Sequence, residues 1–351
     1  MKKLPTAVTI KDIAQLLGLA HTTVSRALND HPQISADTKQ RVRESAAQMG
    51  YVANSGARAM RSGAMPMVGL IVPDVQNEFY STAARTMAHE CSLRGYQLVL
   101  GVSEDDPLRE ERQIRTLRES RAAGVLIVPT AKPTDDSITL LRNTPSVQFL
   151  RFNPKFKGPW VIADDLDGTL RATEHLLGLG HRRIALIGPL RGPSTVERRV
   201  RGFDTALRRL GLDPNSQAQL FGPARPEFGS AALLTLMALP ERPTAVVVAS
   251  SRQVLGVLQA ASARHLLLPG DLSIVSYGDA DWFEVCHPAV TAVALPVREM
   301  SERATGLLFE LLDHPAGRHA AKTEPAFKTQ LMQRASTAPV IAAIRKRRAM
   351  A

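Results

Sequence analysis

Apolar positions near the N-terminus recur at helical spacing and predict a first short helix. Ile13, Leu16 and Leu17 lie three and four positions apart, as the inner face of a helix requires. Thr9 is placed to cap the start of this helix, and Gly18 permits a tight turn after its end. The pattern therefore predicts a helix that is followed at once by a second element.

The second predicted helix has one apolar face and one polar face. The apolar face is formed by Val24, Ala27 and Leu28. The polar face carries side chains that can hydrogen-bond, most of them short: His21, Thr22, Ser25, Arg26 and Asn29. A helix that lies in the major groove of DNA needs short polar side chains near the base edges and an arginine for guanine. The two helices thus predict a helix-turn-helix unit.

A third helix and a stretch of small residues complete the N-terminal region. Ser35 is expected to cap the third helix, and Gly50 suits its end. The stretch that follows contains Gly56 and carries Met60 as a large apolar residue. Two interpretations stay open for it, a plain interdomain linker and a hinge helix that orders only on DNA.

The chain from residue 67 onward alternates short apolar runs with amphipathic stretches. Strands are predicted at 67–72, 97–102, 125–128, 146–150, 183–187, 245–249 and 272–276. Helices are predicted at about 78–94, 107–121, 167–179, 195–210 and 252–264. Buried β-branched runs separated by helices indicate parallel sheets. The series restarts near residue 163, which predicts two doubly wound α/β subdomains with a ligand cleft at the carboxyl ends of their strands.

Composition and charge narrow this picture to a nucleic-acid-binding protein. The 351 residues are 44% hydrophobic, enough for real cores, and no apolar run is long enough for a membrane span. The net charge of +11 is unevenly placed, because residues 1–65 hold nine Lys/Arg against four Asp/Glu. The basic tail 341–351 is more typical of a solvated end than of a nucleic-acid contact.

The remaining features favour a cytoplasmic protein. The start of the chain is basic but is not followed by the apolar core of a signal peptide. Cys91 and Cys286 lack metal-ligand spacing and are interpreted as ordinary thiols in a reducing compartment. We therefore expect no metal and no cofactor.

Several motifs occur in an order that is specific to one family. They lie at 9–14 and 23–29, at 72–74 and 77–80, at 173–176, 180–185, 199 and 202–203, and at 242–245 and 268–273. With them the sequence resembles the LacI/GalR (lactose-repressor) family of bacterial transcription regulators across nearly its whole length. The resemblance implies a repressor that acts as a homodimer on a pseudo-palindromic DNA operator. Its affinity for the operator would change with a small-molecule effector.

The resemblance also implies a division of the chain. Residues 1–53 would form the helix-turn-helix headpiece, 54–65 the hinge, 66–340 the effector-binding core and 341–351 a basic tail. Within the core, the first subdomain would comprise about 66–162 and 294–322, and the second about 163–293 and 323–340. The tail shows no leucine heptad, so a tetramerising coil is not expected.

The DNA-contacting residues follow by position from the same resemblance. His21, Thr22 and Arg26 fall where the family reads bases. Thr9, Ser25 and Asn29 fall at phosphate positions, although a purely structural capping role remains open for each. Asn54 is counted with this set, and Met60 stands where the family inserts a leucine into the minor groove. Ala53 and Gly56 replace the usual proline and a bulkier residue, which should make the unbound hinge less ordered.

The effector cleft departs from the pattern of the sugar-binding members. Three expected acids are replaced by Ser251, Gly278 and Arg151, with Asp279 one place after the second, while Arg199 is retained. Phe79, Tyr80 and Phe152 would form walls, and Thr195 would offer a hydroxyl. Two guanidinium groups without carboxylate partners would favour an anionic effector, such as a sugar acid, sugar phosphate or organic acid.

Purely structural interpretations of the cleft residues stay open as well. Arg151 could simply pair with Asp164 or Asp165, and Phe79 or Phe152 could belong to the core.

Other classes of protein fit less well. A solute-binding or sensor protein would share the two lobes but has no use for the headpiece. A nicotinamide-dependent dehydrogenase would need a Gly-x-Gly-x-x-Gly motif after a strand, and a serine hydrolase would need a Gly-x-Ser-x-Gly elbow. Neither motif occurs, so we expect a regulator and not an enzyme.

Overall fold

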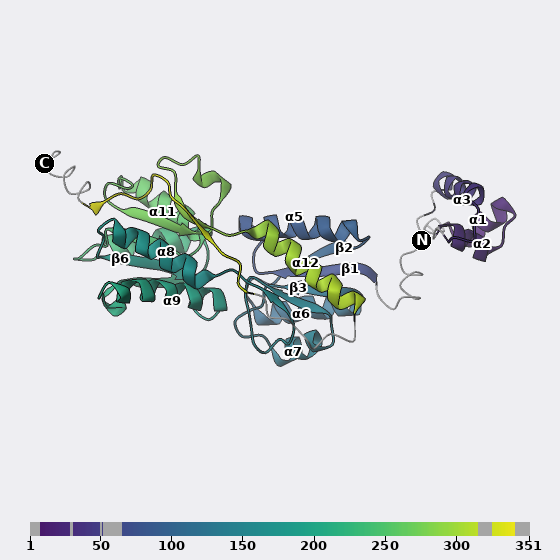
Figure 1. Cartoon of the computed structure of the whole chain (residues 1–351), viewed down its shortest axis with the longest axis horizontal. Helices are drawn as coiled ribbons and strands as arrows, with labels where there is room; N and C mark the ends of the chain where they lie inside the picture. The colour runs from purple at the N-terminus through teal and green to yellow at the C-terminus, as the bar shows by residue number, and fades with distance from the viewer. Residues whose placement is uncertain (1–7, 29–30, 50, 52–64, 315–324, 341–351) are drawn as a thin grey trace, which may run out of the picture. The chain divides into compact units, whose positions relative to one another are not determined.

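The computed structural model describes residues 8–28, 31–49, 51, 65–314 and 325–340 (Figure 1). The chain forms a small unit, Met1–Met65, and a large unit, Pro66–Ala351. Within the described ranges, no helix is both long enough and apolar enough to cross a membrane. The two units are treated separately below.

The described part of the small unit is a cluster of three helices, α1 (Ile10–Leu17), α2 (His21–Leu28) and α3 (Ala36–Gln48). Ile13, Val24 and Val42 are fully buried where the helices meet. As predicted, Gly18 ends α1 in the left-handed region, with φ 61°, and Ser35 caps α3 by accepting a hydrogen bond from the Thr38 amide. The helix-turn-helix arrangement is confirmed.

Leu16 does not belong to the core of this unit, contrary to the sequence prediction. Its side chain is 61% exposed, while Ile13 and Ala14 are buried and Leu17 is half-buried. The buried stripe of this short helix is centred between Ile13, Ala14 and Leu17. Leu16 lies about 100° around the helix from the centre of that stripe, because each residue turns the helix by about 100°.

The first sheet of the large unit contains five parallel strands in the order β2-β1-β3-β4-β5. The strands are β1 (Met65–Val72), β2 (Gln97–Val102), β3 (Ala122–Ile127), β4 (Ser146–Phe149) and β5 (Trp160–Val161). One face is covered by α5 (Glu78–Leu93) and α12 (Val297–Asp313), the other by α6 (Pro107–Glu119) and α7 (Asp135–Arg142). We call this assembly the first lobe.

The second sheet contains six strands in the order β11-β10-β9-β8-β6-β7, and only β11 is antiparallel to its neighbour. The strands are β6 (Ile184–Pro189), β7 (Gln219–Gly222), β8 (Ala245–Val248), β9 (Ser273–Tyr277), β10 (Thr291–Ala294) and β11 (Gln330–Met332). The covering helices are α8 (Asp165–Gly178) and α9 (Ser194–Arg209) on one face, α10 (Pro226–Met237) and α11 (Ser251–Ala263) on the other. This is the second lobe.

Helices α10 and α11 approach each other backbone to backbone. A Cβ atom at Gly229 would lie 2.0 Å from the Gln253 carbonyl oxygen, and one at Gly256 would lie 1.7 Å from the Pro226 carbonyl oxygen. Any side chain at either position would force the two helices apart. This contact holds the start of α11, and with it Ser251, against the carboxyl end of the sheet.

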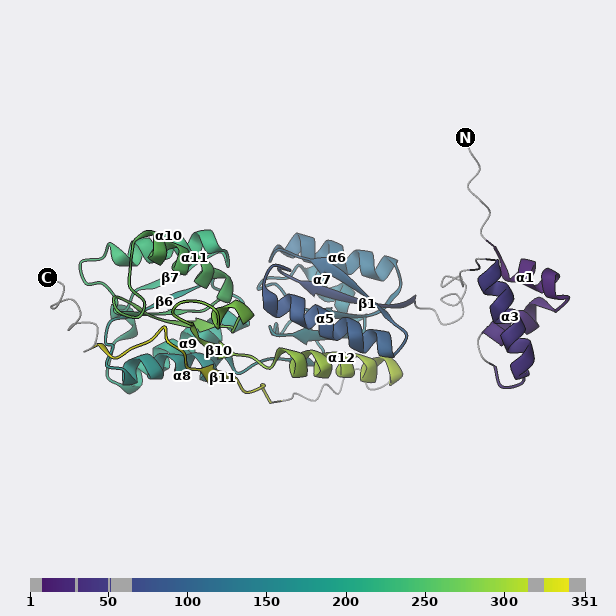
Figure 2. The same ribbon diagram turned by 90° about the horizontal axis from the view of Figure 1, so that it is seen from above.

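The chain crosses between the lobes near three points, as Figure 2 shows from above. It leaves the first lobe after β5, returns through β10 into α12, and reaches the second lobe again before β11. Ala163 and Phe327 form a parallel bridge, and the Asp164 amide donates to the Phe327 carbonyl oxygen at 2.8 Å. The predicted fold, two doubly wound α/β lobes behind a helix-turn-helix unit, is confirmed.

Candidate functional site

The polar face of α2 is held outward by the apolar core of the small unit. His21, Thr22 and Arg26 are exposed, and Ser25 is half-buried on the same helix. Val24 and Ala27 have no exposed surface, so the helix cannot rotate without exposing them. Exposed polar side chains on a fixed helix are the arrangement that base contacts in a major groove require. The predicted residues Asn29, Asn54 and Met60 lie outside the described residues.

Thr9 takes the capping role that the sequence left open. Its amide and its hydroxyl both donate to the Asp12 carboxylate at 2.7 Å. These bonds from Thr9 lower the pKa of Asp12. Because Thr9 remains exposed, the cap leaves it accessible at the surface of the unit. Its contact with phosphate stays a prediction.

Several predicted ligand residues follow strands of the two lobes and lie near the contact between the lobes. Arg151 follows β4 of the first lobe, and Thr195 and Arg199 lie in the first turns of α9 of the second. All three are at least nine-tenths buried. Tyr80 of α5 lies within electrostatic range of both arginines, and burial raises the pKa of its hydroxyl. The structure thus brings residues of both lobes together.

Arg199 is paired with a carboxylate. Its Nε donates to Asp165 Oδ1 at 2.8 Å, and its Nη1 donates to the Ala249 carbonyl oxygen at the same distance. The guanidinium also stacks on the Tyr277 ring, 3.9 Å from the centroid. Burial raises the pKa of Asp165, although Arg199 acts in the opposite direction. This group, buried where α8, α9 and β9 meet, is a polar floor for the cleft.

Arg151 is paired as well, and its partner is Asp105 in the loop after β2. Both Nη atoms donate to the Asp105 carboxylate, one of them at 3.2 Å. The expected alternatives are otherwise engaged, since Asp164 bonds Arg198 and Asp165 bonds Arg199. The prediction of two arginines without carboxylate partners is therefore wrong, and the argument for an anionic effector loses its premise. The loops after β2 and β4 lie together in space. The sequence does not show this, because Asp105 and Arg151 are 46 residues apart along the chain.

The aromatic residues divide between core and cleft wall. Phe79 stacks on Phe149 with centroids 5.7 Å apart and packs against the core of the first lobe. Phe152 packs on Trp160 at 4.5 Å, and its amide donates to Ser194 Oγ of the second lobe at 2.8 Å. Phe79 thus has the core role that the sequence left open, whereas Phe152 lies where the lobes touch.

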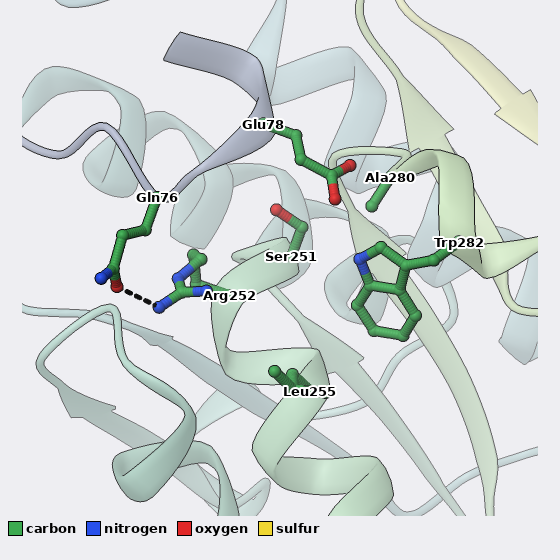
Figure 3. A pocket seen from close by; sticks show the side chains of 7 residues that line it. All are labelled: Gln76, Glu78, Ser251, Arg252, Leu255, Ala280 and Trp282. Atoms are coloured by element: carbon green, nitrogen blue, oxygen red, sulfur yellow. Dashed lines mark hydrogen bonds between the residues drawn. The ribbon is translucent and has the colours of Figure 1, made fainter. Parts of the chain in front are cut away.

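Ser251 lines a small pocket where the lobes meet, with about 270 Å³ of empty space that is partly open to solvent (Figure 3). Gln76 and Glu78 line it from the first lobe. Gln76 Oε1 accepts a hydrogen bond from Arg252 at 2.7 Å, and the Glu78 carboxylate accepts one from the Asp281 amide. Ser251, Arg252, Leu255, Ala280 and Trp282 complete the lining from the second lobe.

Asp279 lies beyond this pocket, and its carboxylate is engaged elsewhere. Both of its oxygens accept from Arg334, at 2.7 and 2.9 Å. Asp279 therefore does not replace the acid that is missing at Gly278. The structure instead supplies acids that the sequence analysis did not assign to the cleft, Asp105 and Asp165, each just after a strand of the first lobe. The position of Asp105 shortly after β2, and of Asp165 shortly after β5, was the feature of the sequence that could have identified them.

Buried polar atoms of the cleft lack partners within the described part of the chain. By strict hydrogen-bond geometry they are Nε of Arg151, Oδ2 of Asp165 and the hydroxyl of Tyr277. The last two lie close enough to interact with each other, since burial raises the pKa of Asp165 and the Tyr277 hydroxyl opposes that rise. A buried polar atom without a partner is costly, so sites of this kind are typically completed by a ligand or water. Arg151 Nε remains as a buried donor without a partner, so a ligand that satisfies it must carry an acceptor.

Comparisons with known proteins agree along the whole chain. Residues 9–54 match the family "Bacterial regulatory proteins, lacI family", and residues 173–337 match a periplasmic binding protein-like domain. The chain is 32% identical over 338 residues to the HTH-type transcriptional repressor CytR of Escherichia coli (strain K12), covering 96% of this chain and 98% of that protein.

Two solved structures extend the comparison. A LacI family transcriptional regulator from Enterococcus faecium with bound ribose is 25% identical, with a TM-score of 0.71 over 78% of this chain and 99% of that one. The lac repressor dimer bound to operator and the anti-inducer ONPF has a TM-score of 0.83 over 95% of this chain and 100% of that one. Its sequence is 22% identical to this chain, so the comparison shows that the two proteins share a fold and shows nothing further.

Proposed function

The chain belongs to the lacI family of bacterial regulatory proteins, and on that premise we propose that it is a sequence-specific transcriptional repressor controlled by a small molecule. One observation carries the proposal, the outward polar face of α2 on a unit of its own, in the same chain as two lobes with a pocket where they meet. A solute-binding protein without operator binding has no use for that face.

In this proposal α2 reads the operator. His21, Thr22 and Arg26 contact base edges in the major groove, while Thr9 and Ser25 contact phosphates. Asn29, Asn54 and Met60 add contacts from outside the described residues, and Met60 is the apolar wedge of the minor groove. The division of the chain is 1–53 for the headpiece, 54–65 for the hinge and 66–340 for the core, with 294–322 in the first subdomain. A repressor of this kind acts in the cytoplasm, on the nucleoid.

The repressor is proposed to act as a homodimer through the open edge of the first lobe. Strand β2 is an edge strand, and Leu93, Val99 and Leu100 beside or on it are 68%, 36% and 45% exposed. An edge strand with exposed apolar side chains pairs readily with another chain. A second copy of this chain would cover the edge and bring two headpieces to two half-sites of a pseudo-palindrome.

The effector is proposed to bind between the lobes against Arg151, Arg199 and Thr195, with Tyr80 and Phe152 as aromatic walls. Its binding would change how the lobes sit on each other, and through the dimer the spacing of the headpieces. Ser251 lies at the rim of this site.

The test is the DNA sequence that the full-length protein selects from a random duplex pool. A two-fold pair of half-sites is expected. Arg26→Ala should weaken binding by about 1–3 kcal/mol and relax the preference at one base pair of each half-site. Arg118→Ala, at an exposed position of α6 in the core, is the matched control and should bind as the wild type does. Selection of a single unrepeated site, or indifference to Arg26, would contradict the proposal.

A further inference from the structure

The Arg151–Asp105 pair is held by an unusual backbone on both sides. Leu150, just before Arg151, has φ 64°, and Glu104 and Asp105 have φ 53° and 58°. None of the three is glycine, and non-glycine residues in the left-handed region persist only where the surrounding structure enforces them. Such positions cluster where a protein must aim particular side chains. Here they aim one guanidinium and one carboxylate at each other.

The pairing with Asp105 does not use every donor of Arg151. Each Nη atom gives one N–H to Asp105, while Nε is buried and has no partner in the described ranges. The Arg151 side chain is 10% exposed, whereas that of Asp105 is 48% exposed. The carboxylate thus faces solvent and the unpartnered donor lies inside. The same guanidinium also lies within electrostatic range of a second buried carboxyl group, Glu110.

We propose that Asp105 is a specificity-determining residue of the effector site, which cancels the charge of Arg151 and so restricts the site to uncharged ligands. The inference rests on the proposed effector function of the cleft. Arg151 then offers its buried Nε–H to a neutral acceptor, such as a hydroxyl, ether or carbonyl oxygen. Because Asp105 already balances the charge of Arg151, the guanidinium adds little of the charge-assisted attraction that holds a carboxylate or phosphate.

The second cation of the cleft reinforces the same selectivity. Arg199 is balanced by Asp165 and uses two of its nitrogens on protein oxygens. An anion in the cleft would therefore meet two cations that are already neutralised, and would lie close to their carboxylates, which repel it. A neutral ligand with hydroxyl groups can instead accept a hydrogen bond from Arg151 Nε without bringing a charge into the site.

Removing the charge of Asp105 should therefore create an anion site. Asp105→Asn is the informative variant, because asparagine tolerates the left-handed region and keeps the shape of the side chain. Sulfate is the probe, measured by thermal unfolding of the full-length protein against chloride at equal ionic strength. We expect Asp105→Asn to bind sulfate roughly tenfold or more tightly than the wild type, because a buried guanidinium has lost its counter-charge.

Two further variants test whether the gain in sulfate binding arises from the Arg151–Asp105 pair. Glu104→Gln makes the same charge change in the same loop, where Glu104 pairs with Arg109, and should leave sulfate binding unchanged. The double variant Asp105→Asn/Arg151→Gln should lose the gained binding. If Asp105→Asn fails to fold, Asp105→Gly suits the same backbone angle and serves the same comparison.

The outcomes of these measurements distinguish a failure of the inference about Asp105 from a failure of the proposed function. The inference is overturned if Asp105→Asn gains no sulfate binding, if the double variant keeps the gain, or if the wild type already binds sulfate in a way that Arg151→Gln removes. Operator binding is measured in parallel for each variant. Normal operator binding with no gain in sulfate binding refutes the role of Asp105 alone, whereas a wild type without any selected operator refutes the repressor proposal itself.

Discussion

Burial of the Glu110 side chain changes the pH at which its carboxyl group ionises. The carboxyl group is fully buried and accepts hydrogen bonds from the Thr130 amide at 2.7 Å and the Thr130 hydroxyl at 3.0 Å. Burial raises its pKa to about 7, and the Thr130 bonds oppose that rise only in part. The folded protein therefore holds a proton at Glu110 that the unfolded chain releases near pH 4.5.

The free energy of unfolding should consequently fall as the pH rises from about 4.5 to about 7 and stay level above. In that window the folded state binds more protons than the unfolded state, so raising the pH favours unfolding. The contribution is on the order of 3 kcal/mol over the whole window. Urea unfolding of Glu110→Gln, which is neutral at every pH, should lack this decline.

Glu119→Gln, at an exposed position of the same helix, is the control and should keep the wild-type decline. An identical pH profile for Glu110→Gln and the wild type would show that Glu110 does not titrate in this range.

Individual side chains also mark the limit of prediction from the sequence. The sequence pointed to Arg151 and Arg199 in the cleft, because the resemblance to the LacI/GalR family places both at ligand positions. It did not predict their partners. Asp105 lies 46 residues from Arg151, and the two meet only because the loops after β2 and β4 open on the same edge of a parallel sheet. Ion pairing of this kind depends on tertiary geometry, which periodicity does not encode.

The helices and strands themselves were predicted far better than the ion pairs, because the spacing of apolar residues along the chain follows directly from which side chains are buried. The strand expected at 97–102 is observed as Gln97–Val102, and the helix expected at 195–210 is observed as Ser194–Arg209. The burial of β2 departs from that of an inner strand, because Val99 and Leu100 remain exposed at the sheet edge. An apolar run alone does not reveal whether a strand is central or at an edge.

Leu100→Lys tests the role of this edge. A charge there would have to be desolvated in the proposed dimer contact, so the variant should sediment as a monomer at concentrations where the wild type is a dimer. Operator affinity should fall with it, because one headpiece alone engages one half-site. Analytical ultracentrifugation and operator titration measure the two effects. Leu210→Lys, at a position of the second lobe that is 53% exposed, should remain dimeric. A dimeric Leu100→Lys would place the interface elsewhere.

The two lobes contact each other at several points besides the crossing segments. Phe152 bonds Ser194, Arg252 bonds Gln76, and the Asp281 amide bonds Glu78. Arg199 of the second lobe also lies within electrostatic range of Tyr80 of the first. A ligand that bonds both sides of the cleft adds its own contacts to those that hold the lobes together, and so shifts the balance of lobe arrangements.

Arg199→Lys should uncouple ligand from operator. Lysine keeps a cation beside Asp165 but lacks the planar fork that reaches the Ala249 carbonyl and stacks on Tyr277. Ligand affinity should fall on the order of tenfold, whereas operator binding without ligand stays normal. Arg199→Ala would leave Asp165 buried without its cation, so it should also destabilise the second lobe.

The measurement is the anisotropy of labelled operator, titrated with whichever uncharged hydroxyl-bearing compound, taken from a panel, changes the binding of the wild type. Arg209→Lys, at an exposed position of the same helix where Arg209 pairs with Glu174, is the control. A wild-type response in Arg199→Lys would remove Arg199 from the proposed site.

The crossings between the lobes also set an order of assembly during synthesis. Helix α12 supplies Met300, Ala304 and Leu308 to the core of the first lobe, and all three are fully buried. Yet α12 follows β6–β10 along the chain, so it emerges from the ribosome only after those strands of the second lobe. The first five strands must therefore wait with one face partly uncovered while most of the other lobe is synthesised. This interval exposes apolar sheet surface, so the nascent chain is most prone to aggregation, and most in need of chaperones, just before residue 297 emerges.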